Sequence, residues 1–135
     1  MKIIQPTTTR VERNTEEEIN AGIRRDTEIR IAAYKQVGPH AIRRRLDKLD
    51  REWDIERTLE ANAAAITLLS LFLGKTKSRL FYAVPAFVAG FLLQHAVQGW
   101  CPPLPVLRRL GVRTPQEIEE ERRGLLAAMR GRRRH

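Results

Sequence analysis

Apolar positions in the first part of the chain follow a helical period. From Asn14, which can act as an N-cap, they recur on roughly one face, at Ile19, Ile23 and Ala33. Gly38-Pro39 ends this stretch, because glycine accepts a left-handed cap and proline cannot continue the hydrogen-bond ladder of a helix. The pattern therefore predicts an amphipathic helix from Asn14 to Gly38.

A sharper apolar stripe follows Pro39. Its members lie four, three and four residues apart: Ile42, Leu46, Leu49 and Trp53. This spacing is typical of a helix-packing seam, so we expect the stripe to bind a protein partner or a second copy of the chain. Nothing between Pro39 and Leu73 obviously breaks a helix. The sequence therefore predicts one continuous helix here, roughly 50 Å long at about 1.5 Å per residue.

The middle of the chain lacks acidic residues. Residues 61–107 contain no Asp or Glu, and two apolar stretches, 61–73 and 80–99, flank a basic turn at 75–79. The second stretch has the length of roughly 20 residues that a bilayer core requires, whereas the first is shorter. The flanking helices are mostly charged and could not cover this apolar pair in water. We therefore predict a transmembrane helical hairpin, and a soluble or re-entrant arrangement is the alternative.

These patterns predict an all-α fold, an integral membrane two-helix hairpin with amphipathic cytoplasmic helices on both sides. Five regions follow: a flexible N-terminus (1–13), a charged amphipathic helical region (14–57), the transmembrane hairpin (58–100), a Pro-rich exit segment (101–113), and a C-terminal helix with a basic tail (114–135). Within the hairpin, the predicted helices are 58–74 and 80–100, and the turn is 75–79.

Prolines and caps organise the region after the hairpin. Three prolines between residues 101 and 106 predict a non-helical exit from the membrane, because proline removes backbone donors. Thr114, followed by Pro115 and by Glu117, is typical of a capping box that begins a last helix. The basic tail suits anionic lipid, at about 1 kcal/mol per residue near the surface. Nucleic acid is less favoured, since the sequence contains no recognisable nucleic-acid-binding fold.

The charge distribution refines this topology. The net charge is +9, and basic residues outnumber acidic ones by 13 to 12 in residues 1–60, by three to none in 61–107, and by nine to four in 108–135. Many basic residues lie on the terminal side of the hairpin, so both termini are predicted to be cytoplasmic, although the three basic residues of the turn argue the other way. No cleavable signal peptide is evident. Mean hydropathy, −0.41, hides the apolar middle.

Two groups of side chains are candidates for membrane contact and for helix pairing. Basic and aromatic residues near the ends of the spans are expected at the membrane interface: Trp53, Arg57, Lys75, Lys77, Arg79, Trp100, Arg108 and Arg109. Antiparallel pairing predicts a polar cluster near the face where the termini emerge: Asn62, Gln94, His95 and Gln98. We expect these residues to hold the helices together or to reach the headgroups, and a ligand or proton site at His95 is the alternative.

Cys101 is the one weak candidate for chemistry. As the single cysteine, it excludes an internal disulfide and a thiolate metal cluster, and no residue pattern indicates a cofactor or metal. Arg108 and Arg109 could favour its thiolate, whereas a small apolar residue packed under Trp100 is the simpler interpretation. The preferred function is a non-enzymatic, membrane-anchored interaction or scaffold protein. The alternative is a thiol-dependent redox or sulfur-relay component using Cys101.

Two stretches carry a resemblance to a known family. They are Asp50-Arg51-Glu52-Trp53-Asp54-Ile55-Glu56-Arg57 and, with its Trp-Cys-Pro exit, residues 92–111. Residues 45–125 resemble a family of small bacterial inner-membrane proteins known as a domain of unknown function, and are similar to the hairpin attached to an inner-membrane rhodanese. The resemblance implies a multi-pass inner-membrane hairpin that self-associates. The chain lacks the rhodanese domain and any cysteine upstream, so sulfurtransferase activity is not implied.

Overall fold

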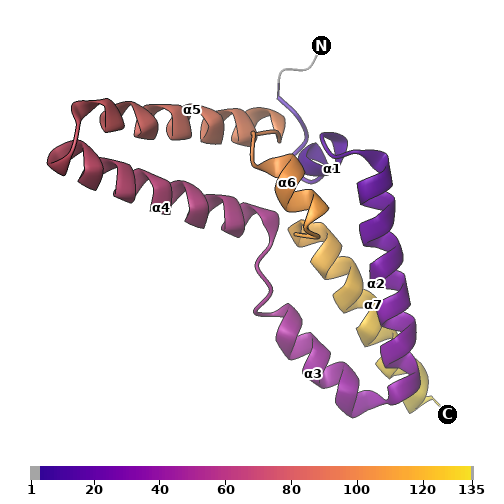
Figure 1. The fold of residues 1–135 in the computed structure, drawn as a ribbon. Helices are drawn as coiled ribbons and strands as arrows, with labels where there is room; N and C mark the ends of the chain where they lie inside the picture. Colours follow the sequence, from indigo (N-terminus) through magenta and orange to yellow (C-terminus); the bar gives the residue numbers. More distant parts are fainter. Residues whose placement is uncertain (1–3, 135) are drawn as a thin grey trace.

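The structure, a computed structural model, describes residues 4–134, which form helices and no strand. Figure 1 shows two arms that meet at a junction. The first arm, the hairpin, consists of α4, η1 and α5, and the second, the head, consists of α2, α3 and α7, while α1 and α6 lie at the junction. The all-α prediction is confirmed. The helices are α1 (Arg10–Arg13), α2 (Glu17–Val37), α3 (Pro39–Leu49), α4 (Ile55–Thr76), η1 (Arg79–Tyr82), α5 (Ala83–Gln98), α6 (Leu104–Arg109) and α7 (Pro115–Arg133).

The two long helices of the hairpin lie side by side and reverse direction between Thr76 and Arg79 (Figure 1). The Ser78 hydroxyl accepts a hydrogen bond from the Leu80 N–H at 3.3 Å and so begins η1. The Tyr82 ring packs directly on Gly74, where an added Cβ would lie 2.7 Å from a ring carbon. The close approach of the two helices at the turn therefore requires glycine at position 74.

The predicted continuous helix from residue 39 to residue 73 is wrong. α3 ends at Leu49 and α4 begins at Ile55, so the chain changes direction between the head and the hairpin. Asp54 caps the new helix, since its Oδ1 accepts the Arg57 N–H at 2.8 Å. The Ile55 N–H has no partner within the helix and donates instead to the Arg113 carbonyl at 2.8 Å. A cap and a tertiary hydrogen bond thus satisfy the backbone groups that the break exposes.

The head is a three-helix bundle in which α2, α3 and α7 all contact one another. Gly38 separates α2 from α3 with a φ of 131°, a conformation that L side chains rarely adopt. Gly124 of α7 lies so close to Ile31 of α2 that an added Cβ would come within 2.5 Å of its side chain. The core of the head consists of buried apolar residues from α3 and α7: Ile42, Leu49, Ile118, Leu125 and Ala128.

The predicted capping box at the start of the last helix is present. The Thr114 Oγ1 accepts the Glu117 N–H at 3.2 Å, and the Glu117 Oε1 accepts the Thr114 N–H at 2.8 Å. The predicted non-helical exit is only partly correct, because Leu104–Arg109 forms α6. Pro105 lies in the first turn of this helix, where a missing N–H leaves no hydrogen bond unmade.

The N-terminal boundary differs from the prediction. α2 begins at Glu17, and Asn14 does not cap it but ends the short helix α1. The segment expected to be a flexible N-terminus up to residue 13 is, from Gln5 onward, in contact with the junction, where the Gln5 N–H donates to the Val97 carbonyl at 3.0 Å. Residues 1–3 lie outside the described residues.

Candidate functional site

The junction joins three separate segments through one carboxylate. Glu56, in the first turn of α4, accepts from Arg10 of α1 at 2.9 Å and pairs with Nε2 of His95 of α5, also at 2.9 Å. His95 is 3% exposed. The carboxylate therefore orients a buried imidazole at the base of the hairpin.

The N-terminal segment closes the end of α5. Asn14 donates from its amide nitrogen to the Gln98 carbonyl at 2.7 Å and so satisfies one of the free carbonyls at the helix end. Gly99 follows with a φ of 79°, and an added Cβ would come within 2.6 Å of the Arg10 backbone. Glycine is thus needed twice over, for the left-handed turn and for the approach of α1. The base of the hairpin is held by backbone contacts as well as by ion pairs.

Cys101 lies beside this buried imidazole. The thiol is 4% exposed and packs with Val11, Ile55, Leu59 and Leu104. It interacts electrostatically with the His95 ring, whose Nδ1 is buried and has no hydrogen-bond partner of normal geometry. Glu56 occupies the other ring nitrogen. A thiol, an imidazole and an orienting carboxylate are the components of an activated cysteine nucleophile.

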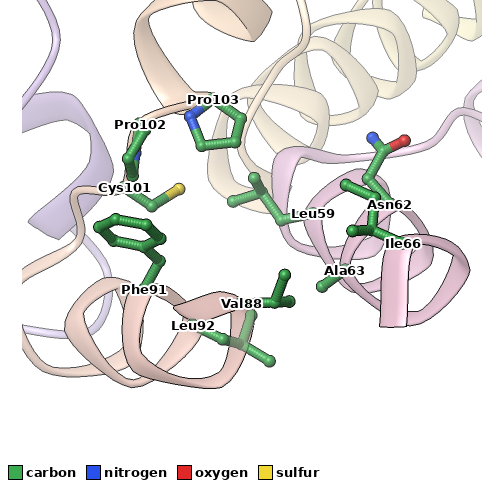
Figure 2. A pocket seen from close by; sticks show the side chains of 10 residues that line it. All are labelled: Leu59, Asn62, Ala63, Ile66, Val88, Phe91, Leu92, Cys101, Pro102 and Pro103. Atoms are coloured by element: carbon green, nitrogen blue, oxygen red, sulfur yellow. The ribbon is translucent and has the colours of Figure 1, made fainter. Parts of the chain in front are cut away.

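An apolar pocket opens next to the thiol, between the two hairpin helices. Its volume is about 220 Å³, and Figure 2 shows the Cys101 sulfur directed into it, between Leu59 and Phe91. Apart from the Asn62 amide and the thiol, the side chains around it are hydrocarbon. They are Leu59, Asn62, Ala63, Ile66, Val88, Phe91, Leu92, Cys101, Pro102 and Pro103.

The predicted polar cluster of the hairpin does not form. His95 pairs with Glu56, whereas Asn62 lies at the apolar pocket and Gln94 at a separate groove with Phe87. Gln98 has an exposed side chain, and only its backbone carbonyl takes part in the junction. Antiparallel pairing fixes which residues lie at the same depth, but the direction of each side chain around its helix decides which ones meet. The missed partner, Glu56, lies two residues before the predicted span.

Arg108 does not lie at the membrane interface, where the sequence placed it. It is 1% exposed, and its guanidinium pairs with Glu117 at 2.5 Å and donates to the Asn20 amide oxygen at 2.9 Å. Its charge is therefore neutralised inside the head rather than directed at Cys101. Arg109 is exposed and pairs with Glu16 at 3.1 Å. The expected stabilisation of a thiolate by these two arginines is not supported.

A second buried ion-pair network ties the head to the α3–α4 linker. Arg113 binds both carboxylate oxygens of Glu52, at 2.8 and 2.6 Å, and reaches Glu121 at 2.5 Å. Glu121 is fully buried and also accepts from Arg45 at 2.8 Å and from Arg30 at 2.9 Å. This network was not predicted from the sequence. The signal was available, because position 121 falls within the apolar stripe of α7, where a carboxylate requires partners.

The arginine partners lower the pKa values of the two buried glutamates, Glu117 and Glu121. Burial by itself would raise the pKa of Glu117, but the Arg108 guanidinium and the Thr114 N–H outweigh it and lower the pKa below its ordinary value. Burial would likewise raise the pKa of Glu121, but hydrogen bonds from Arg45 and Arg113 lower it. Both carboxylates are held in the charged form that the head requires.

The apolar stripe predicted to bind a partner is used inside the chain. Ile42 and Leu49 are 0% and 2% exposed and pack on α7, and Leu46 is half-buried beside them. The prediction of a free partner-binding stripe is therefore wrong for these three residues. Trp53 lies in the linker instead, 48% exposed, with the Arg57 guanidinium 4.5 Å from its ring centre.

The other predicted interface residues lie at the two ends of the hairpin. Lys75, Lys77 and Arg79 are exposed at the turn. Trp100 is half-buried at the base, where it packs against the cluster that contains Cys101. This arrangement puts basic groups at one end of the hairpin and an aromatic side chain at the other.

One helical stretch of the described residues, Arg79–Gln98, is long and apolar enough to cross a membrane. Only 6% of its most apolar window is buried, whereas a core helix of a soluble protein is mostly buried. α4 does not meet the same criterion. Among residues 4–134, no three His, Cys, Asp or Glu side chains converge into a metal site.

No protein-family model, curated protein or solved structure matches this chain. The resemblance to the hairpin family stays a prediction. The function therefore rests on the geometry of the hairpin, the junction and the head.

Proposed function

We propose that this chain is a non-enzymatic bacterial inner-membrane protein whose hairpin spans the bilayer and whose head binds a partner in the cytoplasm. The observation that carries the proposal is the direction of the large apolar side chains of the hairpin. They point outward and are exposed in α4, η1 and α5: Leu68 68%, Phe72 63%, Leu80 83%, Phe87 68% and Leu93 67%. Such exposed apolar side chains along an arm are stable in lipid rather than in water.

The length and the end groups of the hairpin support this assignment. α4 has 22 residues and Arg79–Gln98 has 20, which correspond to roughly 33 and 30 Å at about 1.5 Å per residue. A bilayer core is about 30 Å thick. The shorter apolar run of α4 is compensated if Lys75 and Lys77 extend to the headgroups at one end and Arg57 at the other. Both termini are then cytoplasmic, as the basic excess outside the hairpin favours.

The head offers a partner surface other than the buried stripe. A groove of about 500 Å³ runs between α2 and α7, and the residues that line it are Ile31, Lys35, Gly124, Ala127, Ala128, Gly131 and Arg132. Small residues such as Ala127 and Gly131 admit a closely packed helix, and the basic side chains favour an acidic one. The tail at residues 130–134 lies at the end of the head remote from the hairpin (Figure 1), so it reaches anionic lipid only if the head lies along the membrane surface.

Topology is tested with single-cysteine variants in a Cys101→Ser background. Thr76→Cys is exposed at the turn of the hairpin, and Gln36→Cys is exposed in the head. After a carbonate wash, the protein is expected to remain in the membrane. An impermeant maleimide should label Thr76→Cys in spheroplasts and Gln36→Cys only after lysis. Release into the soluble fraction, or equal labelling of both positions in spheroplasts, would contradict the proposal.

A further inference from the structure

We infer that Cys101 is an S-acylation site, at which His95 acts as the base, Glu56 positions it, and the apolar pocket holds the acyl chain. This inference goes beyond membrane anchoring and concerns the junction alone. The reacting groups come from three segments, α4, α5 and the exit after Gly99. The fold, rather than sequence proximity, brings them together.

The imidazole is arranged as a base toward the thiol. With its Nε2–H committed to the Glu56 carboxylate at 2.9 Å, neutral His95 has its free lone pair on Nδ1, which is buried and unpaired. The Cys101 thiol interacts with the same ring. Apart from this thiol, the ionisable groups at the ring are Glu56 and, through it, Arg10. Glu56 contacts the base and not the reacting atoms, so it is a positioning residue.

The pocket selects the substrate class. An apolar cavity of roughly 150 Å³ is enough to bind benzene, so the pocket of about 220 Å³ accommodates part of a hydrocarbon chain. Its lining offers little to a polar substrate. Cys101 is the single cysteine, so the chain supplies no second thiol to resolve a sulfenic acid or persulfide as an internal disulfide. An acyl group on the thiol places its tail in the pocket and needs no second thiol.

The reaction balances without an oxidant or reductant. The Cys101 thiol gives its proton to Nδ1 of His95, and the thiolate sulfur attacks the carbonyl carbon of an acyl thioester. The bond between that carbon and the donor sulfur then breaks. The departing thiolate takes the proton from His95. One thioester is consumed and one is formed, on Cys101.

The reaction is tested with purified full-length protein in detergent micelles and octanoyl-coenzyme A. Intact mass should show one octanoyl group per chain, removed by neutral hydroxylamine, and Cys101→Ser should show none. An unmodified wild-type protein, or equal modification of Cys101→Ser, would overturn the inference. Because micelles impose no orientation, this result is independent of the topology experiment.

His95→Gln should lower the rate of octanoyl transfer by roughly 100-fold, at the lower end of the 10²–10⁴ range for general acid–base catalysis. Circular dichroism checks that the variant keeps its helices. Glu56→Gln should move the rising limb of the pH–rate profile to lower pH, because the imidazolium loses the carboxylate that stabilises it. A purely structural role of Glu56 would leave that limb in place, and an unchanged rate in folded His95→Gln would overturn the assignment of the base.

The role of the pocket in holding the acyl chain is tested with substitutions that leave Cys101, His95 and Glu56 unchanged. Ala63 lines the pocket, whereas its neighbour Ala64 is exposed and does not. Ala63→Leu should lower the ratio of octanoyl to acetyl transfer, measured with the two coenzyme A thioesters, by about tenfold, and Ala64→Leu should leave the wild-type ratio. Equal ratios in the two variants would overturn the assignment of the pocket to the acyl chain.

Discussion

The head and the hairpin distribute their side chains in opposite ways. In the head and at its contact with α6, Arg108 and Glu121 are among the most deeply buried side chains, together with Ile42 and Leu125. In the hairpin, large apolar side chains such as Leu80 are on the outside. Charge is tolerated inside the head because each buried group is paired, and apolar surface is tolerated outside the hairpin only where the solvent is lipid. This difference is what the proposed membrane location of the hairpin requires.

Acidification should have the largest effect, because it is expected to unfold the head while the hairpin keeps its helices. The pKa values of Glu117 and Glu121 are lowered in the folded head from an ordinary value of 4.5, so their stabilisation is complete above that pH and is lost as the pH falls through the lowered values. The hairpin has carboxylates only near the start of α4, at Glu56 and Glu60, and residues 61–107 have none to protonate. In micelles below pH 4.5, far-ultraviolet circular dichroism should retain a helical fraction that matches the hairpin. Simultaneous loss of all helical signal would contradict this comparison.

Glu121→Ala should destabilise the head by about 3–5 kcal/mol, because Arg113, Arg45 and Arg30 lose a fully buried partner. Denaturant unfolding in micelles, followed by the fluorescence of the two tryptophans, measures this change. Glu119→Ala on the same helix is the control. Its carboxylate is exposed and pairs with the partly exposed Arg122, so a loss under about 1 kcal/mol is expected. Equal losses in both variants would show that the buried network is not the source of stability.

Arginine substitutions at two exposed isoleucines, one in each arm, test whether that arm lies in lipid or in water. Ile66 lies near the middle of α4 and is 46% exposed, and Ile29 of α2 is 60% exposed. Ile66→Arg should oppose membrane insertion by about 3 kcal/mol, whereas Ile29→Arg should have little effect. The carbonate-resistant fraction of each variant measures the difference. If Ile66→Arg is retained as fully as Ile29→Arg, the hairpin does not span the bilayer as proposed.

The smallest effect is expected at the start of α7. Thr114→Ala removes the side-chain half of the capping box and should lower the free energy of unfolding by about 1 kcal/mol. Thr114→Ser should stay close to wild type, since serine provides the same acceptor. The same denaturant experiment provides the measurement. A serine variant as unstable as the alanine variant would indicate that packing of the methyl group, rather than the cap, matters at this position.

Local signals predicted much of the helical framework. The capping residues Thr114 and Glu117, the break at Gly38-Pro39 and the turn near residues 75–79 all act within a few residues of chain. The missed break between α3 and α4 had a local signal as well, because Asp54 is a good N-cap. The apolar stripe that continues to Trp53 nevertheless favoured one continuous helix. The break also depends on Arg113, which lies far away along the chain.

Much less of the candidate site could be predicted from the sequence. Cys101 and His95 were each singled out, but Glu56 was not assigned to them, and the apolar pocket was not foreseen. Periodicity says which residues share a helix face, not which face meets another helix. The partner of His95 depends on how α1, α4 and α5 meet at the junction.

The sequence by itself determined the helical content, the apolar middle of the chain without acidic residues and the capped start of the last helix, because propensity, hydropathy and capping act over a few neighbouring residues. Tertiary structure alone decided that Arg108 and Glu121 are buried partners, that the stripe from Ile42 to Leu49 faces α7, and that Cys101 meets His95. The physical reason is that burial and pairing depend on groups distant in sequence. A charged or apolar side chain has the same local signal whether it meets solvent or a partner.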